Sequence, residues 1–229
     1  METFDKNKFN KLIEEKNVFG FYNEAKTLGD GRKTWLFIDW KPLMSDVFLT
    51  DKLADFVLAF VKSENLKVDS FYGVPESATK IALICQYKLA KQSGCFSEKS
   101  HVLSLGRGNP RTHHKRPQDN YFLGKPKGEV IVIEDVVASG ESLITALDNL
   151  KEANISVSGV IALSDRLDKR NDNLGVKDIV EKRGLRFYCM SSLVEILPLI
   201  YKKLTPREKI MKGITKEFRE AHTSRINLL

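Results

Sequence analysis

Two adjacent carboxylic acids, Glu134 and Asp135, stand between a run of β-branched residues and a turn of small residues. The turn at 138–142 reads Ala-Ser-Gly-Glu-Ser, and a segment with helical spacing follows it. Backbone N–H groups and hydroxyls at the N-terminus of a helix favour a bound phosphate. Carboxylates beside such a site are useful when the ligand also offers sugar hydroxyls, because each carboxylate can accept paired hydrogen bonds. The residue types and their order therefore predict a site for a phosphorylated ribose.

The elements that must position these groups alternate between strands and helices. Apolar and β-branched runs predict strands at 68–74, 101–105, 129–137, 157–163 and 185–189. Apolar residues at helical spacing predict helices at 1–12, 53–64, 80–92, 143–153 and 191–201. This alternation is typical of βαβ units, so we expect an α/β fold with a mostly parallel central sheet flanked by helices. Such sheets bind ligands at the carboxyl ends of their strands, where the acid pair stands.

Composition and other motifs exclude several classes of protein. The chain has 229 residues, no GxxxxGK[ST] motif, and a GRGNPR segment at 106–111 that lacks the third glycine of a dinucleotide fingerprint. Its three cysteines show no CxxC spacing, which argues against a disulfide framework and a zinc site and favours the cytoplasm. The N-terminus has no apolar signal segment, and no run approaches the roughly 18 residues of a membrane span. We expect no membrane association.

The net charge of +7 is concentrated in two segments. Residues 101–127 contain six basic residues and one acidic residue, and residues 201–229 contain eight basic residues and three acidic ones. The rest of the chain is therefore slightly acidic. The first segment overlaps a 23-residue stretch, 106–128, that has no hydrophobic period, as a lid or binding loop would. For the tail we favour a solvated or dimer-packing helix over a nucleic-acid arm, because basic runs are common on solvated faces.

Four segments carry a resemblance to a known family. Val130–Ser142, VIVIEDVVASGES, resembles the phosphoribosyl diphosphate (PRPP) motif of type I phosphoribosyltransferases. Gly29–Asp39 (GDGRKTWLFID), Gly73–Ala78 (GVPESA) and Ile161–Asp168 (IALSDRLD) resemble segments of orotate phosphoribosyltransferases within that family. The similarity runs from about residue 17 to residue 197. It implies a phosphoribosyltransferase domain at 1–204, with an N-terminal hood at 1–45 and a mobile catalytic loop at 106–128, and a basic tail or helix at 205–229.

The resemblance also implies an activity and its requirements. The chain would be a glycosyltransferase that transfers the phosphoribosyl group of PRPP to orotate in pyrimidine (UMP) biosynthesis. Mg²⁺ would be held through the substrate pyrophosphate, without a dedicated set of protein ligands. A homodimer with the loop shared across its interface is expected, and no nucleic acid partner. Two alternatives are a phosphoribosyltransferase for another base and a PRPP-sensing regulator with this fold.

Roles follow residue by residue. Glu134 and Asp135 would hold the ribose hydroxyls, and Phe37 and Arg166 would contact orotate. The 5′-phosphate would be bound by Ala138, Ser139, Gly140, Glu141 and Ser142. The pyrophosphate would be lined by Glu76, Ser77, Ala78 and Thr79. For Arg166 the alternative is a structural role, capping a strand end through Asp165.

This sequence departs from the family pattern at several positions. The catalytic loop fits a pattern like RKxxKxHG in two registers. One uses Arg107, Arg111 and His113, and the other uses Arg111 and Lys115, with Pro117 in place of the histidine; we prefer the first because it keeps a histidine. A lysine expected near the pyrophosphate is replaced, displaced to Lys26 or supplied by Lys33. Glu141 places a carboxylate beside a phosphate, which repels the ligand unless it points to solvent.

Overall fold

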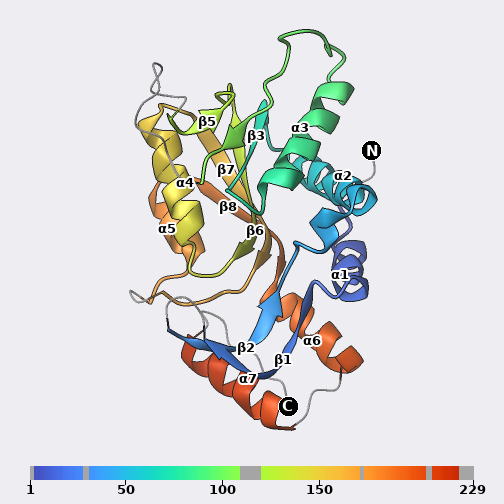
Figure 1. The fold of residues 1–229 in the computed structure, drawn as a ribbon, viewed down its shortest axis with the longest axis vertical. Helices are drawn as coiled ribbons and strands as arrows, with labels where there is room; N and C mark the ends of the chain where they lie inside the picture. The colour runs from blue at the N-terminus through green and yellow to red at the C-terminus, as the bar shows by residue number, and fades with distance from the viewer. Residues whose placement is uncertain (1–2, 28–30, 109–119, 171–172, 205–207, 222–229) are drawn as a thin grey trace.

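Strand β6 (Val130–Val137) lies inside a four-stranded sheet in the computed structural model, which describes residues 3–27, 31–108, 120–170, 173–204 and 208–221 (Figure 1). The sheet also contains β3 (Ser70–Gly73), β7 (Val157–Asp165) and β8 (Arg186–Ser192), in the order β3-β6-β7-β8. All three pairings are parallel. The expected α/β fold with a mostly parallel central sheet is confirmed.

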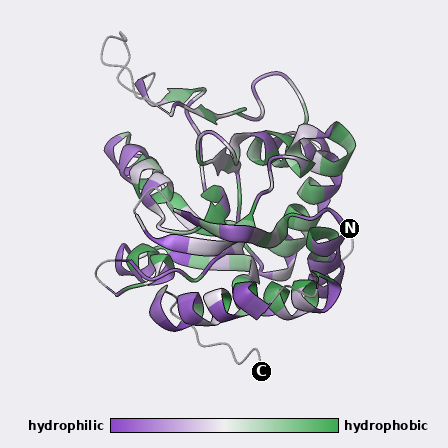
Figure 2. Cartoon of the chain, turned by 60° about the horizontal axis from the view of Figure 1, so that its bottom comes forward, coloured by the Kyte–Doolittle hydropathy of each residue, from purple (hydrophilic) through white to green (hydrophobic). Residues whose placement is uncertain are grey.

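Helices cover both faces of this sheet, which is why β6 reads as a continuous apolar run. The helices α2 (Val47–Ser63) and α3 (Thr79–Gln92) lie on one face, and α4 (Glu141–Glu152) and α5 (Val176–Lys182) lie on the other (Figure 1). Side chains of β6 alternate between the two cores: Ile131 and Ile133 pack with the first pair of helices, Val130 and Val132 with the second. Hydrophilic residues colour the outer sides of the helices (Figure 2).

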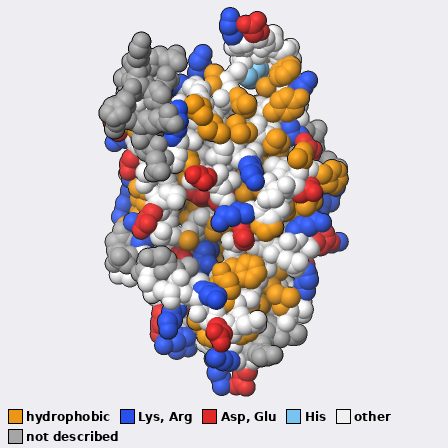
Figure 3. All heavy atoms as spheres, in the orientation of Figure 1, with side chains coloured by type: hydrophobic (Ala, Val, Ile, Leu, Met, Phe, Trp, Pro, Cys, Tyr) orange, Lys and Arg blue, Asp and Glu red, His pale blue; other side chains and the backbone are white. Residues whose placement is uncertain are grey.

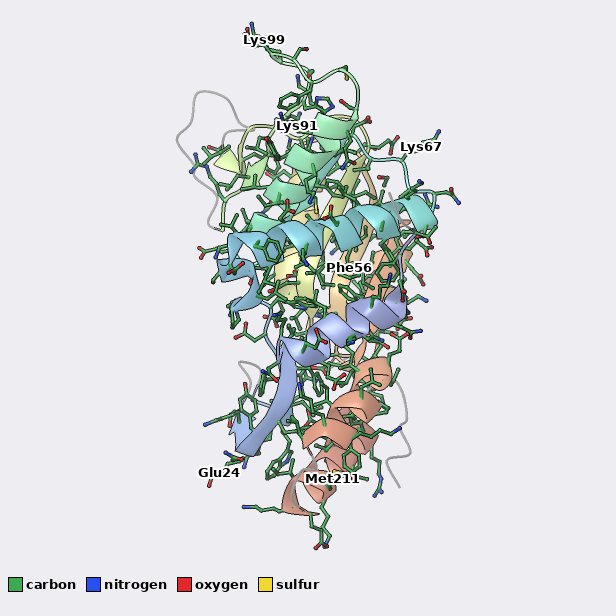
Figure 4. The ribbon with its side chains drawn as sticks, turned by 90° about the vertical axis from the view of Figure 1, so that its right-hand side faces the viewer. Glu24, Phe56, Lys67, Lys91, Lys99 and Met211 are labelled. Carbon is green, nitrogen blue, oxygen red and sulfur yellow. The ribbon has the colours of Figure 1, made fainter. Side chains whose placement is uncertain are left out.

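A hairpin and three helices form the end of the molecule opposite strand β5 (Phe122–Leu123). Strands β1 (Phe19–Thr27) and β2 (Lys33–Ile38) pair antiparallel, and α1 (Lys6–Glu15), α6 (Leu193–Leu204) and α7 (Glu208–Ala221) pack near them (Figure 1). A 3₁₀ turn, η1 (Leu43–Ser45), connects this part to α2. Figure 4 shows Glu24 of β1 and Met211 of α7 at the same end of the molecule.

The basic tail thus contains a helix that packs on the fold. Ile210, Ile214 and Phe218 of α7 are buried in the same hydrophobic core as α1, α2 and α6. Their spacing of four residues places them on one face, and the lysines of the helix lie elsewhere on its surface. The interaction of α7 within its own chain was not anticipated from the sequence.

A short antiparallel pair precedes and follows the basic loop. Strands β4 (Leu105–Gly106) and β5 (Phe122–Leu123) have two residues each, and residues 109–119 between them lie outside the described residues. The prediction of a strand at 101–105 was wrong except for its last residue, because 101–104 pair with no strand in the described part of the chain. No helix among the described segments combines the length and hydrophobicity that a membrane crossing needs.

Trp40 joins the hairpin end to the sheet. Its side chain is fully buried, stacks on Phe9 of α1 with ring centroids 5.6 Å apart, and donates from Nε1 to Ser164 Oγ of β7 at 3.1 Å. Trp40 therefore stabilises the fold both by packing and by the hydrogen bond of its indole N–H.

We predict that Trp40→Ala lowers the free energy of unfolding by about 3–5 kcal/mol, because it opens a large cavity and leaves Ser164 without its donor. Phe48→Ala is the matched control, since Phe48 is 64% exposed on α2, and its effect is expected to stay within about 0.5 kcal/mol. Urea unfolding of both variants measures this. Equal losses for the two variants would contradict the role given to Trp40.

Candidate functional site

A cleft of about 660 Å³ opens at the carboxyl ends of β3 and β6. Residues after β3 and after β6 form two of its walls, and residues 38–44 beyond β2 form a third. Figure 3 shows acidic and basic side chains side by side across the middle of the face that it draws. The residues that line the cleft and that the sequence singled out are Glu76, Ser77, Glu134, Asp135, Ala138, Ser139, Gly140, Glu141 and Ser142. The structure brings the acid pair and the two loops into one cavity.

Gly140 shapes the turn after β6. It precedes the first residue of α4 with a φ of 73°, in the left-handed region that favours glycine. A Cβ there would meet a Val176 side-chain carbon at 2.6 Å, so glycine also allows α5 to pack against the turn. The N-terminus of α4 consequently opens onto the cleft. Glu141 begins this helix and is exposed, which is the orientation that keeps its carboxylate in solvent.

The acid pair is buried at the end of β6. Glu134 and Asp135 are each 7% exposed, and Asp135 Oδ1 accepts from the backbone N–H of Val136 at 2.9 Å. Burial, together with the neighbouring Asp135 charge, raises the pKa of Glu134 to about 9. Glu134 therefore keeps a proton at neutral pH and can donate a hydrogen bond as well as accept one. The pair offers both donor and acceptor groups to hydroxyls in the cleft.

The loop after β3 folds back tightly on itself. A Cβ at Gly73 would clash with the backbone carbonyl of Ala78, so a side chain cannot be accommodated at the end of this strand. The loop contains a cis peptide bond between Pro75 and Glu76. Ser77 Oγ is buried and has no hydrogen-bond partner among the described residues. Because Ser77 lines the cleft just before α3, its hydroxyl and the N-terminus of that helix are available to an anion.

Several residues that the sequence singled out lie elsewhere. Lys26 is exposed on β1, and Phe37 lies over Gly20 with its ring 5.3 Å from that of Tyr22. Arg107 lines a smaller cavity beside Glu141 and Ser142. Thr79 begins α3, Ala78 precedes it at the helix N-cap, and neither lines the cleft. Arg111 and His113 lie outside the described residues, as does the alternative register at Lys115 and Pro117.

Arg166 is buried beside the hairpin and does not line the cleft. It is 5% exposed, and its guanidinium donates to the Leu36 carbonyl at 3.2 Å and to Thr34 Oγ1 at 3.0 Å. It also lies 3.4 Å from Asp168 and 3.3 Å from Glu217. Every side of the guanidinium therefore contacts protein, and orotate contact through Arg166 stays a prediction.

Glu217 of α7 is a residue that the sequence reasoning missed. Its carboxylate is 7% exposed and accepts from Thr34 Oγ1 at 2.7 Å and from the Trp35 backbone N–H at 2.8 Å, in addition to Arg166. The one available signal was its position next to Phe218 on the apolar face of a helix. The Glu217 carboxylate thus pairs with the guanidinium that, according to the resemblance, would contact orotate.

The chain was compared with known protein families, curated proteins and solved structures. No family model matches the chain. It is 27% identical over 168 residues to an orotate phosphoribosyltransferase of Caenorhabditis elegans, covering 73% of this chain and 68% of that protein. It is also 27% identical over 131 residues to the transcriptional regulator GfcR of Methanocaldococcus jannaschii, covering 57% of this chain and 59% of the regulator. The crystal structure of orotate phosphoribosyltransferase from Francisella tularensis superposes with a TM-score of 0.68 at 17% identity, over 94% of this chain and all of that one.

The fold and the cleft define the chain as a type I phosphoribosyltransferase in architecture. The curated relative from Caenorhabditis elegans is named an orotate phosphoribosyltransferase. So is one from Aquifex aeolicus, which is 25% identical to this chain over that protein's whole length. The chain is therefore a relative of this group of glycosyltransferases, and the resemblance expected from its motifs is confirmed.

The raised pKa of Glu134 predicts a pH dependence of stability. Because the folded protein holds a proton up to about pH 9 that the unfolded chain loses near its ordinary pKa of 4.5, unfolding free energy falls as pH rises between about 5 and 9. This one group contributes at most about 1.4 kcal/mol per pH unit. Glu134→Gln is expected to flatten the slope, whereas the exposed Glu129→Gln leaves it unchanged. Denaturant titrations from pH 5 to 9 measure it, and an unchanged slope in Glu134→Gln would refute the assignment.

Gly140→Ala is predicted to damage the phosphate turn. The substitution must adopt a positive φ and also displace Val176, so we expect a loss of about 2–4 kcal/mol in stability and at least tenfold weaker PRPP binding. Gly184→Ala is the matched control, because Gly184 has a φ of 77° with no atom near the added Cβ. It should cost about 1 kcal/mol and leave PRPP binding intact. Thermal unfolding and calorimetric titration distinguish the two variants.

Proposed function

We propose that the chain is an orotate phosphoribosyltransferase, which converts PRPP and orotate to orotidine 5′-monophosphate and pyrophosphate in pyrimidine biosynthesis. The observation that carries the proposal is the cleft, where a buried acid pair, a glycine turn at a helix N-terminus and the loop after β3 meet. These are the groups that a phosphate, a ribose and a pyrophosphate each require. The names of the relatives add orotate as the base.

In the proposed complex a different segment of the cleft binds each part of PRPP. The turn at 138–142 binds the 5′-phosphate through backbone N–H groups and hydroxyls. Glu134 and Asp135 hydrogen-bond the two ribose hydroxyls, with the proton on Glu134 supplying a donor. The loop at 76–79 lies along the pyrophosphate, where the unpaired Ser77 hydroxyl gains a partner.

The reaction breaks the bond between C1′ of the ribose and the pyrophosphate oxygen and forms a bond from C1′ to N1 of orotate. The bonding pair leaves with pyrophosphate, and the lone pair of the N1 anion forms the new bond, so the protein needs no strong base. As C1′ acquires positive character, the Asp135 carboxylate beside the ribose stabilises it, and fixed groups hold the two reactants together. Exclusion of water from the cleft prevents hydrolysis of the ribosyl cation.

Magnesium is part of the proposal and suits the donor set. The described residues contain no group of three or more His, Cys, Asp or Glu side chains placed to hold a metal. The cleft does contain the carboxyl groups of Glu76, Glu134 and Asp135, and Mg²⁺ is commonly bound through one or two carboxylates together with substrate phosphates. When bound, it would neutralise charge on the departing pyrophosphate. A cytoplasmic homodimer whose 106–128 loop closes over the neighbouring cleft completes the proposal and rests on the resemblance.

A second candidate is a phosphoribosyltransferase for a different base. The contacts of Arg166 favour it, because Glu217 already supplies the carboxylate that the guanidinium would otherwise take from orotate. In this case the cleft and its PRPP chemistry are unchanged, and the base would have no carboxylate. The similarity to the transcriptional regulator GfcR supports a further alternative, in which the PRPP site serves regulation.

Pyrophosphate release from PRPP in the presence of Mg²⁺, with orotate, uracil, adenine or hypoxanthine, tests the proposal. We expect activity with orotate, and a decrease of about 10²-fold in kcat/KM for Asp135→Asn, because one stabilising group is lost. The control Asp148→Asn removes an exposed carboxylate on α4 and should retain activity. Chelation of Mg²⁺ should abolish turnover. Activity with another base alone would establish the second candidate, and no turnover with any base would contradict both.

A further inference from the structure

A second cavity, larger than the cleft, lies between α7, the start of β2 and the segment after β7. Its volume is about 770 Å³, within the usual range for small-molecule sites, and it shares no lining residue with the cleft. Among its lining residues, the resemblance to phosphoribosyltransferases gave a role only to Lys33, as a candidate pyrophosphate contact. Its walls come from three segments that are far apart in the sequence.

The wall from α7 carries three lysines. Lys209, Lys212 and Lys216 are spaced by three and four residues, so they follow one another along one side of the helix, toward the cavity. The buried residues of the same helix face the hairpin instead. Part of the basic charge of the tail, for which the sequence predicted no function, therefore lines this cavity.

The other two walls add four more cationic residues. Arg32 and Lys33 come from the start of β2, and Lys169 and Arg170 come from the segment after β7. Arg32 donates to the Lys169 carbonyl at 3.1 Å and lies 3.4 Å from Asp168, which fixes its guanidinium at the cavity wall. The acidic lining residues are Glu217, which is bound to Arg166, and Glu220. Cations gathered from three segments around one hollow concentrate anions there.

Arg170 carries an unused donor in this wall. One end of its guanidinium donates to the Ser139 carbonyl in the turn of the cleft. Its Nε is buried and has no hydrogen-bond partner within the part of the chain that the structure describes. A buried cationic N–H without a partner is costly, and Arg170 is one of the residues that line the second cavity.

Trp35 gives the cavity an aromatic surface. Its indole lies directly against the backbone of α7 at Gly213, where a Cβ would clash with the ring. The close contact holds the ring in place, and Trp35 lines the cavity beside the cationic side chains. Aromatic rings and cations side by side are what a nucleotide requires, since its base stacks and its phosphates pair with positive charge.

We propose that this second cavity binds a nucleoside triphosphate, with its phosphates on the lysines of α7 and on Arg170 and its base against Trp35. The site is distinct from the PRPP cleft, and the proposal does not depend on which base the cleft uses. A nucleotide is favoured over a nucleic acid strand because the cations are gathered around one hollow of about 770 Å³, which matches the size of a small ligand.

Calorimetric titration of the full chain with ATP, UTP and inorganic tripolyphosphate tests the proposal. We expect both nucleotides to bind with one site per chain, and the double variant Lys209→Ala, Lys216→Ala to bind at least tenfold more weakly. Lys177→Ala, Lys182→Ala is the matched control, because it removes two exposed lysines from α5 and should leave affinity unchanged. Asp135→Asn, which alters the cleft, should also leave nucleotide affinity unchanged.

Tryptophan fluorescence tests the contact with the base. The chain has two tryptophans, and Trp40 is fully buried, so quenching by a nucleotide reports on Trp35. ATP and UTP should quench the emission and tripolyphosphate should not; equal affinity for all three without quenching would show a phosphate site only and overturn the nucleotide assignment. No binding of any of the three probes, or binding lost in Asp135→Asn, would overturn the site itself. Failure of the transferase assay would leave each of these results interpretable.

Discussion

The buried guanidinium of Arg166 connects the parts of this molecule that its functions depend on. It follows β7, bonds to Thr34 and Leu36 of β2, and meets Glu217 of α7, so three segments far apart in sequence converge on one charge. Loss of one partner from such a pair would leave the other charge buried and cost about 3–5 kcal/mol. The position of α7 against the hairpin, and with it one wall of the second cavity, depends on this contact. The same contact removes Arg166 from the surface of the cleft.

The cleft itself is built from the more rigid part of the fold. Its acids end a strand that is paired on both sides and buried on both faces, and its two loops each lead into a helix. Glycine at positions 73 and 140 allows backbone and side chains to approach where another residue would clash. The groups proposed to bind PRPP are therefore held in place before any ligand arrives, which lowers the cost of ordering them. Residues 109–119 of the basic loop, which is expected to move, lie outside the described residues.

The central sheet and the glycine turn after β6 could be predicted from sequence because their signals are local. β6 reads as a buried strand, and its acids, glycine and helix follow within a dozen residues. The hairpin β1–β2 was not predicted: the family resemblance gave only a hood at 1–45, and the burial of β1 shows no clear alternation along the strand. The helix α5 was missed because it has seven residues, fewer than a helical period needs to be recognised. Glu217 was missed because its partners are about 50 and 180 residues away and only the fold brings them together.

The central claim is that the end of β6 is a site for phosphorylated ribose. A crystal structure of the chain with PRPP and Mg²⁺ tests it most directly. We expect the 5′-phosphate at the turn 138–142, the ribose hydroxyls on Glu134 and Asp135, and the pyrophosphate along the loop at 76–79. PRPP bound in the second cavity with the cleft empty, or PRPP in the cleft with its ribose away from both acids, would contradict it.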